Sequence, residues 1–179
     1  KRMFEEILKD YSFAYGITTL ALRYFNAAGA DPQMRNGYIQ KPATHLIPTL
    51  ANCFLTDTEF TINGDQYFTP DGTTIRDYTH VDDIARAHVA AMTYDGEETE
   101  MNLSAMSEHS VKEVISAFEE MTGKTIPIKV GPDRPCEPRI NSGRNDRAKK
   151  ELNWEPQWEF SDIIRHAYEW EATRLPGEK

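Results

Sequence analysis

Residues 18–25 read Thr-Thr-Leu-Ala-Leu-Arg-Tyr-Phe, and this stretch decides the fold class of the chain. It is rich in apolar and β-prone residues and carries one charged side chain, Arg23, as expected of a strand buried in a parallel sheet. Residues 1–15 before it place aromatic and leucine side chains on one stripe and are followed by Gly16, which predicts an amphipathic helix that ends there. A helix that leads into a buried strand indicates an α/β fold.

The rest of the chain alternates helical and strand patterns. Asp82 and Asp83 are expected to cap one helix, and Ser110 with Glu113 forms the capping box of another. Residues 69–72, Thr-Pro-Asp-Gly, predict a tight turn within a small hairpin. Helices are expected over 45–54, 82–92, 111–121, 146–152 and after Ser161, where Ile163, Ile164, Ala167 and Trp170 would be buried, and short strands over 60–62 and 126–130.

No G-x-G-x-x-G motif lies between a strand and a helix anywhere in the sequence, so no dinucleotide-binding fingerprint is present. The strand at 18–25 has the composition of one with neighbours on both sides, yet no strand precedes it. We therefore expect the chain to be a fragment in which the N-terminal βαβ nucleotide-binding half is absent.

Composition excludes several classes of partner. With 29 acidic and 20 basic residues the formal net charge is −9, which repels nucleic acid and anionic membrane surfaces. No apolar run approaches the roughly 20 residues that cross a bilayer, and the start of the chain is too acidic for a secretory signal. Cys53 and Cys136 lack zinc-ligand spacing and are expected to be reduced thiols. These features predict a cytoplasmic protein with no metal site and no nucleic-acid or membrane partner.

Two stretches are irregular, and the first of them is a candidate for function. Residues 26–42 form a connection longer than usual, and residues 132–143 are rich in proline. Arg76 and Arg134 stand in polar surroundings, and a planar guanidinium binds phosphate oxygens in a bidentate manner. A structural ion pair with a neighbouring Asp is the alternative interpretation of each arginine, and spacing alone does not decide between the two.

Three blocks of sequence together suggest a family. They are Leu22-Arg23-Tyr24-Phe25-Asn26-Ala27-Ala28-Gly29-Ala30, His45-Leu46-Ile47-Pro48, and Thr69-Pro70-Asp71-Gly72-Thr73 leading into Arg76-Asp77-Tyr78-Thr79-His80-Val81-Asp82-Asp83. In order and spacing they resemble the UDP-glucose (UDP-galactose) 4-epimerases of the extended short-chain dehydrogenase/reductase family, and the resemblance extends over essentially the whole chain. It implies the C-terminal part of a Rossmann-like fold with a small substrate-binding domain.

The resemblance also implies domain boundaries. Residues 1–25 would be the last helix and strand of the NAD-binding domain, and residues 26–179 mainly the UDP-sugar-binding domain, with 76–103 partly returning to the Rossmann sheet. Lys1 falls on the lysine of the family's Y-x-x-x-K motif, so the catalytic tyrosine would precede it. Lys1 would hold the nicotinamide ribose and lower the pKa of that tyrosine. Lys1, Tyr24 and Asn26 are thus the implied cofactor-binding residues.

The implied substrate contacts come from several segments. Arg76 and Arg134 would clamp the diphosphate, and Glu137 would bind a ribose hydroxyl. Asn141 falls at the position that limits the size of the sugar, so N-acetylhexosamine nucleotides are a further hypothesis. The remaining implied contacts are Asn26 on the sugar or diphosphate, His45 and Leu46 over the nucleotide, and Thr61, Ile62 and Asn63 around the uracil.

The implied reaction interconverts UDP-glucose and UDP-galactose. Bound NAD removes hydride from C4, the 4-keto sugar rotates, and hydride returns to the other face. The family pairs as homodimers through the helix that contains Y-x-x-x-K, so residues 1–15 would join that interface. The chain alone is expected to be inactive and to need its N-terminal half.

Two alternatives to this function stay open. One is another nucleotide-sugar enzyme of the same scaffold, such as a UDP-N-acetylhexosamine or pentose 4-epimerase, a 4,6-dehydratase or a decarboxylase. The other is a non-catalytic module that binds nucleotide sugars.

Overall fold

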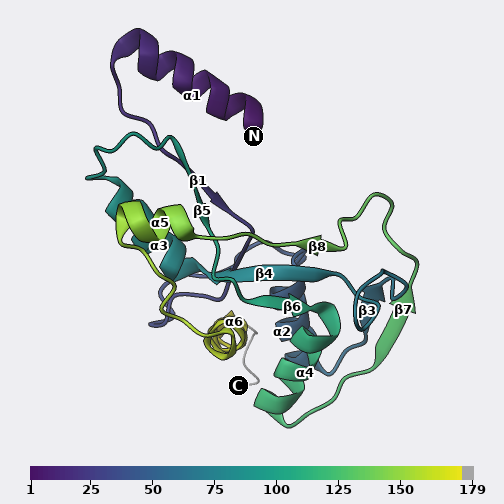
Figure 1. Ribbon diagram of the computed structural model, residues 1–179. Coiled ribbons are helices and arrows are strands. Elements are labelled where there is room, and N and C mark those ends of the chain that lie inside the picture. The colour runs from purple at the N-terminus through teal and green to yellow at the C-terminus, as the bar shows by residue number, and fades with distance from the viewer. Residues whose placement is uncertain (175–179) are drawn as a thin grey trace.

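Strand β4 (Ile75–His80) is the centre of the fold because three other strands pair with it. Strands β2 (Asn26–Ala28) and β8 (Ile140–Asn141) run parallel to β4, and β6 (Glu108–Ser110) runs antiparallel to it. The structure, a computed structural model, describes residues 1–174 (Figure 1). Two further parallel pairs join β1 (Ala21–Tyr24) to β5 (Glu100–Leu103) and β3 (Phe60–Asn63) to β7 (Ile128–Gly131). The expected α/β fold is confirmed.

Six helices surround these strands in the described part of the chain. Helices α2, α4 and α6 pack together on one side of β4, whereas α3 and α5 lie near β5 (Figure 1). Their bounds are α1 (Arg2–Tyr15), α2 (Leu46–Thr56), α3 (Val81–Ala91), α4 (Val111–Thr122), α5 (Asp146–Leu152) and α6 (Phe160–Arg174). Each predicted helix is present, with ends shifted by a few residues at most.

The larger hydrophobic core lies between β4 and helices α2, α4 and α6. The rings of Phe54 and Phe118 are both fully buried and stack with centroids 5.3 Å apart. Ile163 and Ile164 of α6 are buried as predicted, but Trp170 is only half-buried because its indole N–H reaches out to the carbonyl of Tyr38, 2.8 Å away. A smaller core around Met101, Leu103 and Trp154 joins α3 and α5 to β5.

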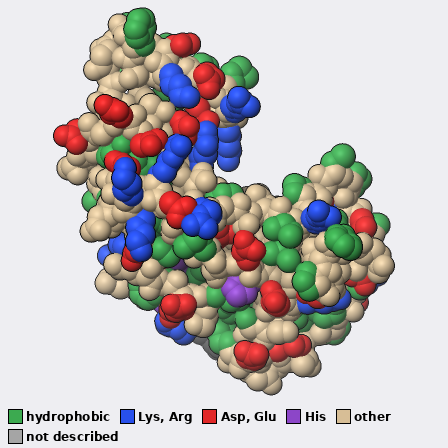
Figure 2. All heavy atoms as spheres, in the orientation of Figure 1, with side chains coloured by type: hydrophobic (Ala, Val, Ile, Leu, Met, Phe, Trp, Pro, Cys, Tyr) green, Lys and Arg blue, Asp and Glu red, His purple; other side chains and the backbone are tan. Residues whose placement is uncertain are grey.

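Helix α1 stands away from the rest of the molecule (Figure 1). It contains no buried residue, and the predicted stripe of Phe4, Leu8, Tyr11 and Tyr15 is largely exposed. An ion pair from Glu5 to Arg23 ties α1 to β1. Figure 2 shows Lys and Arg side chains interspersed with Asp and Glu over this arm.

Strand β1 is parallel, as predicted, but it is not buried. Arg23 and Tyr24 are exposed, and among the residues that the structure describes only β5 pairs with β1. The prediction of a buried strand is therefore wrong for this chain, because one edge of β1 has no neighbour here. The composition of 18–25 suits a strand with two neighbours.

The predicted caps of α3 are also wrong. His80 is the N-cap, and its Nδ1 accepts a hydrogen bond from the Asp82 N–H at 3.0 Å. Asp83 is buried and instead accepts N–H bonds from Gln157 and Trp158, at 3.0 and 3.3 Å. A histidine side chain is an uncommon N-cap, which is why the aspartates were preferred. In α4, by contrast, the Ser110–Glu113 capping box and the left-handed Gly123 at the end are confirmed.

The predicted hairpin around residues 69–72 is replaced by long-range pairing. The turn itself forms, with Gly72 at φ 82° and its N–H 3.3 Å from the Thr69 carbonyl. Strand β3, however, pairs in parallel with β7, more than 60 residues later in the chain.

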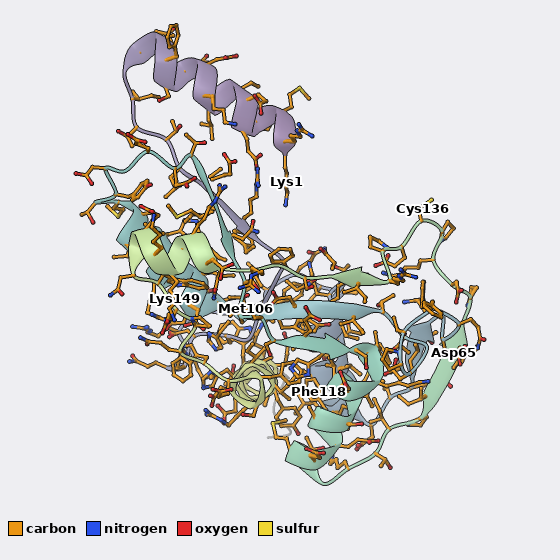
Figure 3. All side chains as sticks on the ribbon, in the orientation of Figure 1. Lys1, Asp65, Met106, Phe118, Cys136 and Lys149 are labelled. Atoms are coloured by element: carbon orange, nitrogen blue, oxygen red, sulfur yellow. The ribbon has the colours of Figure 1, made fainter. Side chains whose placement is uncertain are left out.

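Both cysteines are free. Cys53 lies within α2, and Cys136, which is labelled in Figure 3, is exposed in a loop. No described helix is long and apolar enough to cross a membrane.

A buried pair of histidines joins α3 to α6. His80 Nε2 lies 2.9 Å from His166 Nδ1, and both residues are almost fully buried. Because His80 Nδ1 accepts the Asp82 N–H, the neutral His80 ring is protonated at Nε2 and donates to His166. Burial, and then the neighbouring His166, lower the pKa of His80 to about 4, and burial lowers that of His166 as well.

This pair predicts a pH dependence of stability. Folded His80 binds its proton more weakly than the unfolded chain does, so unfolding takes up protons below about pH 6.5. The free energy of unfolding should be constant above that pH and fall by on the order of 1–2 kcal/mol by pH 5. Urea titrations between pH 5 and 8 measure this change. The variant His88→Gln, on the exposed face of α3, should behave as the wild type; a flat profile from pH 5 to 6.5 would contradict the assignment.

Candidate functional site

One cavity brings together most of the predicted site residues. This central cavity, of about 620 Å³, lies between β2, β4, the start of α2, β3 and the segment 134–137. Nine of the twelve residues predicted from the sequence line it: Asn26, His45, Leu46, Thr61, Ile62, Asn63, Arg76, Arg134 and Glu137. Their roles stay predictions, but their placement around one cavity is a feature of the fold.

Three predicted residues do not line the central cavity. Lys1 is exposed at the start of α1, where Figure 3 shows its side chain extending toward the body of the molecule. Tyr24 is exposed at the end of β1. Asn141 pairs in register with Arg76 across β8 and β4, yet its side chain is exposed outside the cavity lining. Its predicted effect on sugar size stays a prediction.

The two arginines reach the cavity from segments far apart in the sequence. Arg76 projects from β4, is 13% exposed, and forms an ion pair with Glu137. Its Nη1 donates to the carbonyl of Ile75 at 2.7 Å. Arg134 is exposed, and within residues 1–174 its guanidinium has no ion-pair partner. Neither arginine pairs with the adjacent aspartate, but Arg76 does form a structural ion pair, with Glu137, which is what the alternative interpretation expects of that arginine except for the partner.

Glu137 therefore has a partner that the sequence did not predict. One carboxylate oxygen, Oε1, is held by Arg76 Nη2. The ion pair compensates for much of the charge of the partly buried Arg76 and fixes the position of the loop. A ribose contact of the predicted kind would have to use the other oxygen, Oε2.

The N-terminus of α2 adds positive potential to the cavity. The first turn of an α-helix carries N–H groups without intrahelical partners, and the helix dipole places partial positive charge there. In α2 the N-cap His45 makes no side-chain capping bond, and Leu46, Ile47 and Pro48 of the first turn line the cavity. Together with Arg76 and Arg134 this arrangement favours an anionic ligand.

Asn26 lies where the chain passes from β1 to β2. Its Nδ2 donates to the carbonyl of Asp77 on β4 at 3.0 Å, which fixes the orientation of the amide. The carbonyl oxygen Oδ1 is then left as the acceptor for a ligand. The family resemblance implied this residue as a ligand contact.

Strand β3 forms one wall of the central cavity. Phe60 and Ile62 are buried, whereas Thr61 and Asn63 are exposed, the alternation of a strand with one face on the core. Pairing with β7 holds the strand in place.

Sequence reasoning missed Tyr67 as a positioning residue. Its hydroxyl accepts the backbone N–H of Arg134 at 3.0 Å and so fixes the segment that carries the free guanidinium. No local signal links Tyr67 to a residue 67 positions away.

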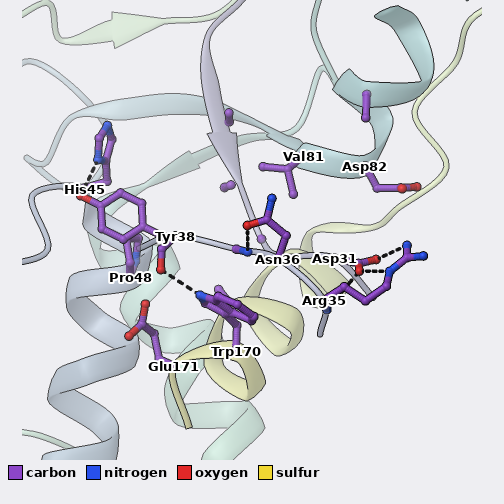
Figure 4. Close-up of a pocket in the computed structure, with 16 residues that line it drawn as sticks. Asp31, Arg35, Asn36, Tyr38, His45, Pro48, Val81, Asp82, Trp170 and Glu171 are labelled. Carbon is purple, nitrogen blue, oxygen red and sulfur yellow. Dashed lines mark hydrogen bonds and ion pairs between the residues drawn. The ribbon is translucent and has the colours of Figure 1, made fainter. Parts of the chain in front are cut away.

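A second cavity, which we call the loop cavity, adjoins the first. It has a volume of about 640 Å³ and is lined mainly by the long connection after β2 together with α6 (Figure 4). The two cavities share Ala27, Ala28, His45 and Pro48. His45 thus lies on the wall between them. The other polar side chains around the loop cavity include Asp31, Arg35, Tyr38, Asp82, Trp170 and Glu171.

Gly64, directly after β3, lies in close contact with Asp133 in the segment that contains Arg134. Its φ is +83°, and a Cβ at this position would lie 2.1 Å from Asp133 Oδ1 and 2.8 Å from Asp133 Cα. Gly64→Ala should lower the free energy of unfolding by roughly 2–4 kcal/mol, because alanine is disfavoured in the left-handed backbone conformation and its Cβ would overlap Asp133. The matched control is Gly123→Ala, with φ +67° and open space around it, which should cost about 1 kcal/mol. Equal losses in urea titrations would show that the two segments are not in close contact.

Comparison with known proteins identifies the family. Residues 1–104 match the NAD dependent epimerase/dehydratase family. A UDP-glucose 4-epimerase of Rhizobium leguminosarum bv. trifolii is 38% identical over 176 residues, which cover 96% of this chain and 54% of the relative. The sequence-based resemblance to these enzymes is confirmed, and the chain spans about half the length of the curated relatives it matches.

Solved structures agree with this match. The UDP-glucose 4-epimerase from Bifidobacterium longum, in complex with NAD+ and UDP, superposes with a TM-score of 0.89 at 34% identity, covering 97% of this chain and 53% of that one. The UDP-Glc/GlcNAc 4-epimerase from Campylobacter jejuni has a TM-score of 0.76 at 36% identity, with 97% and 54% covered. The chain therefore belongs to the NAD dependent epimerase/dehydratase family.

Proposed function

We propose that this chain binds the UDP-sugar substrate within an NAD-dependent UDP-glucose 4-epimerase. The observation that carries the proposal is the convergence of Arg76 and Arg134, with the N-terminus of α2, on one cavity of about 620 Å³. A nucleoside diphosphate has two linked phosphates, and two guanidinium groups from separate segments can hold one on either side.

The remaining lining residues suit the other parts of the substrate. The edge of β3 at Thr61, Ile62 and Asn63 offers backbone groups to the uracil, and Glu137 Oε2 is proposed to accept from a ribose hydroxyl. Asn26 Oδ1 is proposed to contact the sugar or the diphosphate, since its amide nitrogen is already bound to β4. A firm grip on the nucleotide would let the sugar rotate without leaving the site.

The proposed cofactor contacts lie on the arm formed by α1 and β1. Lys1 and Tyr24 are exposed there, and one edge of β1 pairs with no strand among residues 1–174 and is open to a further strand. When bound, NAD supplies hydride removal at C4 of the sugar and its return. Lys1 would hold the nicotinamide ribose as a donor, and Tyr24 and Asn26 would line the nicotinamide side of the substrate. Residues 1–25 are accordingly assigned to the NAD-binding domain.

The chain on its own is proposed to bind the nucleotide without turning it over. Its 179 residues contain no glycine-rich dinucleotide motif. Catalysis is proposed to need a Rossmann half that supplies this motif and the family's tyrosine base, and pairing into a homodimer through α1 is proposed by analogy with the family. Activity of the purified 179-residue chain would refute this part.

Calorimetry tests the nucleotide site directly. UDP should bind more tightly than UMP, and UMP more tightly than uridine, because the diphosphate is the main anchor. Arg134→Ala should weaken UDP binding roughly 10- to 100-fold, the effect of losing a charge-assisted hydrogen bond, and leave uridine binding unchanged.

Arg144→Ala is the matched control for this experiment. Arg144 is an exposed arginine that pairs with Asp146 and lies outside the central cavity. Its removal should not alter UDP affinity. Equal affinities for UDP and uridine, or equal losses in the two variants, would contradict a diphosphate site at Arg134.

A further inference from the structure

We infer that Tyr38 is a positioning residue for nucleotide binding: its hydroxyl holds the His45 ring so that Nε2 is the nitrogen free to donate to a ligand in the central cavity. This inference rests on the proposed function of that cavity. It concerns a residue that lines the loop cavity and not the central cavity.

The contact is direct. Tyr38 Oη lies 3.2 Å from His45 Nδ1, and the two rings meet edge to face with centroids 5.3 Å apart. Figure 4 shows the hydroxyl of Tyr38 pointing to the ring of His45. Thr44 Oγ1 is the other neighbour of Nδ1, at 3.4 Å. Both partners therefore engage Nδ1 and leave Nε2 without a hydrogen bond among the described residues.

The distribution of protons follows from the donors present. The backbone N–H of Thr44 donates to Tyr38 Oη at 3.1 Å, so this oxygen is already an acceptor. Its single proton can go to His45 Nδ1, to Thr44 Oγ1 at 3.1 Å, or to Gln40 Oε1 at 3.3 Å. Imidazole nitrogen is the most basic of the three, and the exposed Gln40 can bond to water instead. Donation to Nδ1 leaves the proton of neutral His45 on Nε2.

Helix α6 fixes the backbone from which Tyr38 reaches His45. The indole N–H of Trp170 donates to the Tyr38 carbonyl at 2.8 Å, and Arg174 donates to the same carbonyl and to that of Ile39. Gly37 packs so closely on the Trp170 ring that a Cβ there would come within 2.6 Å of it. Helix α6 thus holds the backbone at Tyr38 and Ile39 in place, and the Tyr38 hydroxyl in turn holds the His45 ring.

Holding His45 in this way matters because the residue is shared by both cavities. A histidine at the start of a helix can rotate about two side-chain bonds. A ring fixed in advance loses less conformational entropy when a ligand binds. The expected gain is in affinity for the nucleotide and not in the stability of the fold.

A double-mutant cycle tests the inference on the 179-residue chain with UDP as the probe. Tyr38→Phe should weaken UDP binding roughly three- to tenfold, as expected for one hydrogen bond. In a His45→Asn background, which removes the imidazole nitrogen that Tyr38 contacts and keeps an amide donor, Tyr38→Phe should change the affinity less than about twofold. A merely structural effect on the loop would weaken binding equally in both backgrounds.

The matched control is Tyr94→Phe. The hydroxyl of Tyr94 also accepts a backbone N–H, that of Glu98 at 2.9 Å, but lies in the smaller core away from both cavities. It should leave UDP affinity unchanged. If the wild type binds UDP but Tyr38→Phe has equal effects in the two backgrounds, or no effect in either, this inference alone is overturned. Absence of UDP binding by the wild type would overturn the proposed function and this inference with it.

Discussion

The ion pair between Arg76 and Glu137 is the interaction on which the site depends. It joins the central strand β4 to a loop 61 residues later, and the same loop presents Arg134. Strand β4 also receives the amide of Asn26 on its backbone, so one strand sets the position of groups from β2 and from the loop. A partly buried guanidinium needs such a partner, because an unpaired charge there would be costly. The ion pair meets that requirement, and both of its residues line the cavity.

Most of the local structure could be predicted from the sequence because it is encoded locally. The capping box at Ser110 and the glycine after α4 act within a few residues, and the amphipathic pattern of α1 gave its full extent. Contacts between distant residues could not be predicted in this way. The histidine cap of α3 depends on its bond to His166, and the pairing of β3 with β7 depends on the packing of the whole domain.

The candidate site shows the same division. Arg76 and Arg134 were candidates because of their polar surroundings, the family resemblance implied a role on the diphosphate, and the fold brings both to one cavity. Tyr38 and Tyr67 were not found, since each acts through a neighbour and carries no motif of its own. The exposure of β1 has a different cause: its composition suits two neighbouring strands, and only one lies within the described residues. Positioning residues and open edges become visible only in three dimensions.

The most direct measurement of the central claim is a crystal structure of the chain with UDP. The account predicts diphosphate oxygens within hydrogen-bond distance of both Arg76 and Arg134, with the uracil against β3. UDP bound elsewhere, or held in the cavity with neither guanidinium on its phosphates, would contradict the account.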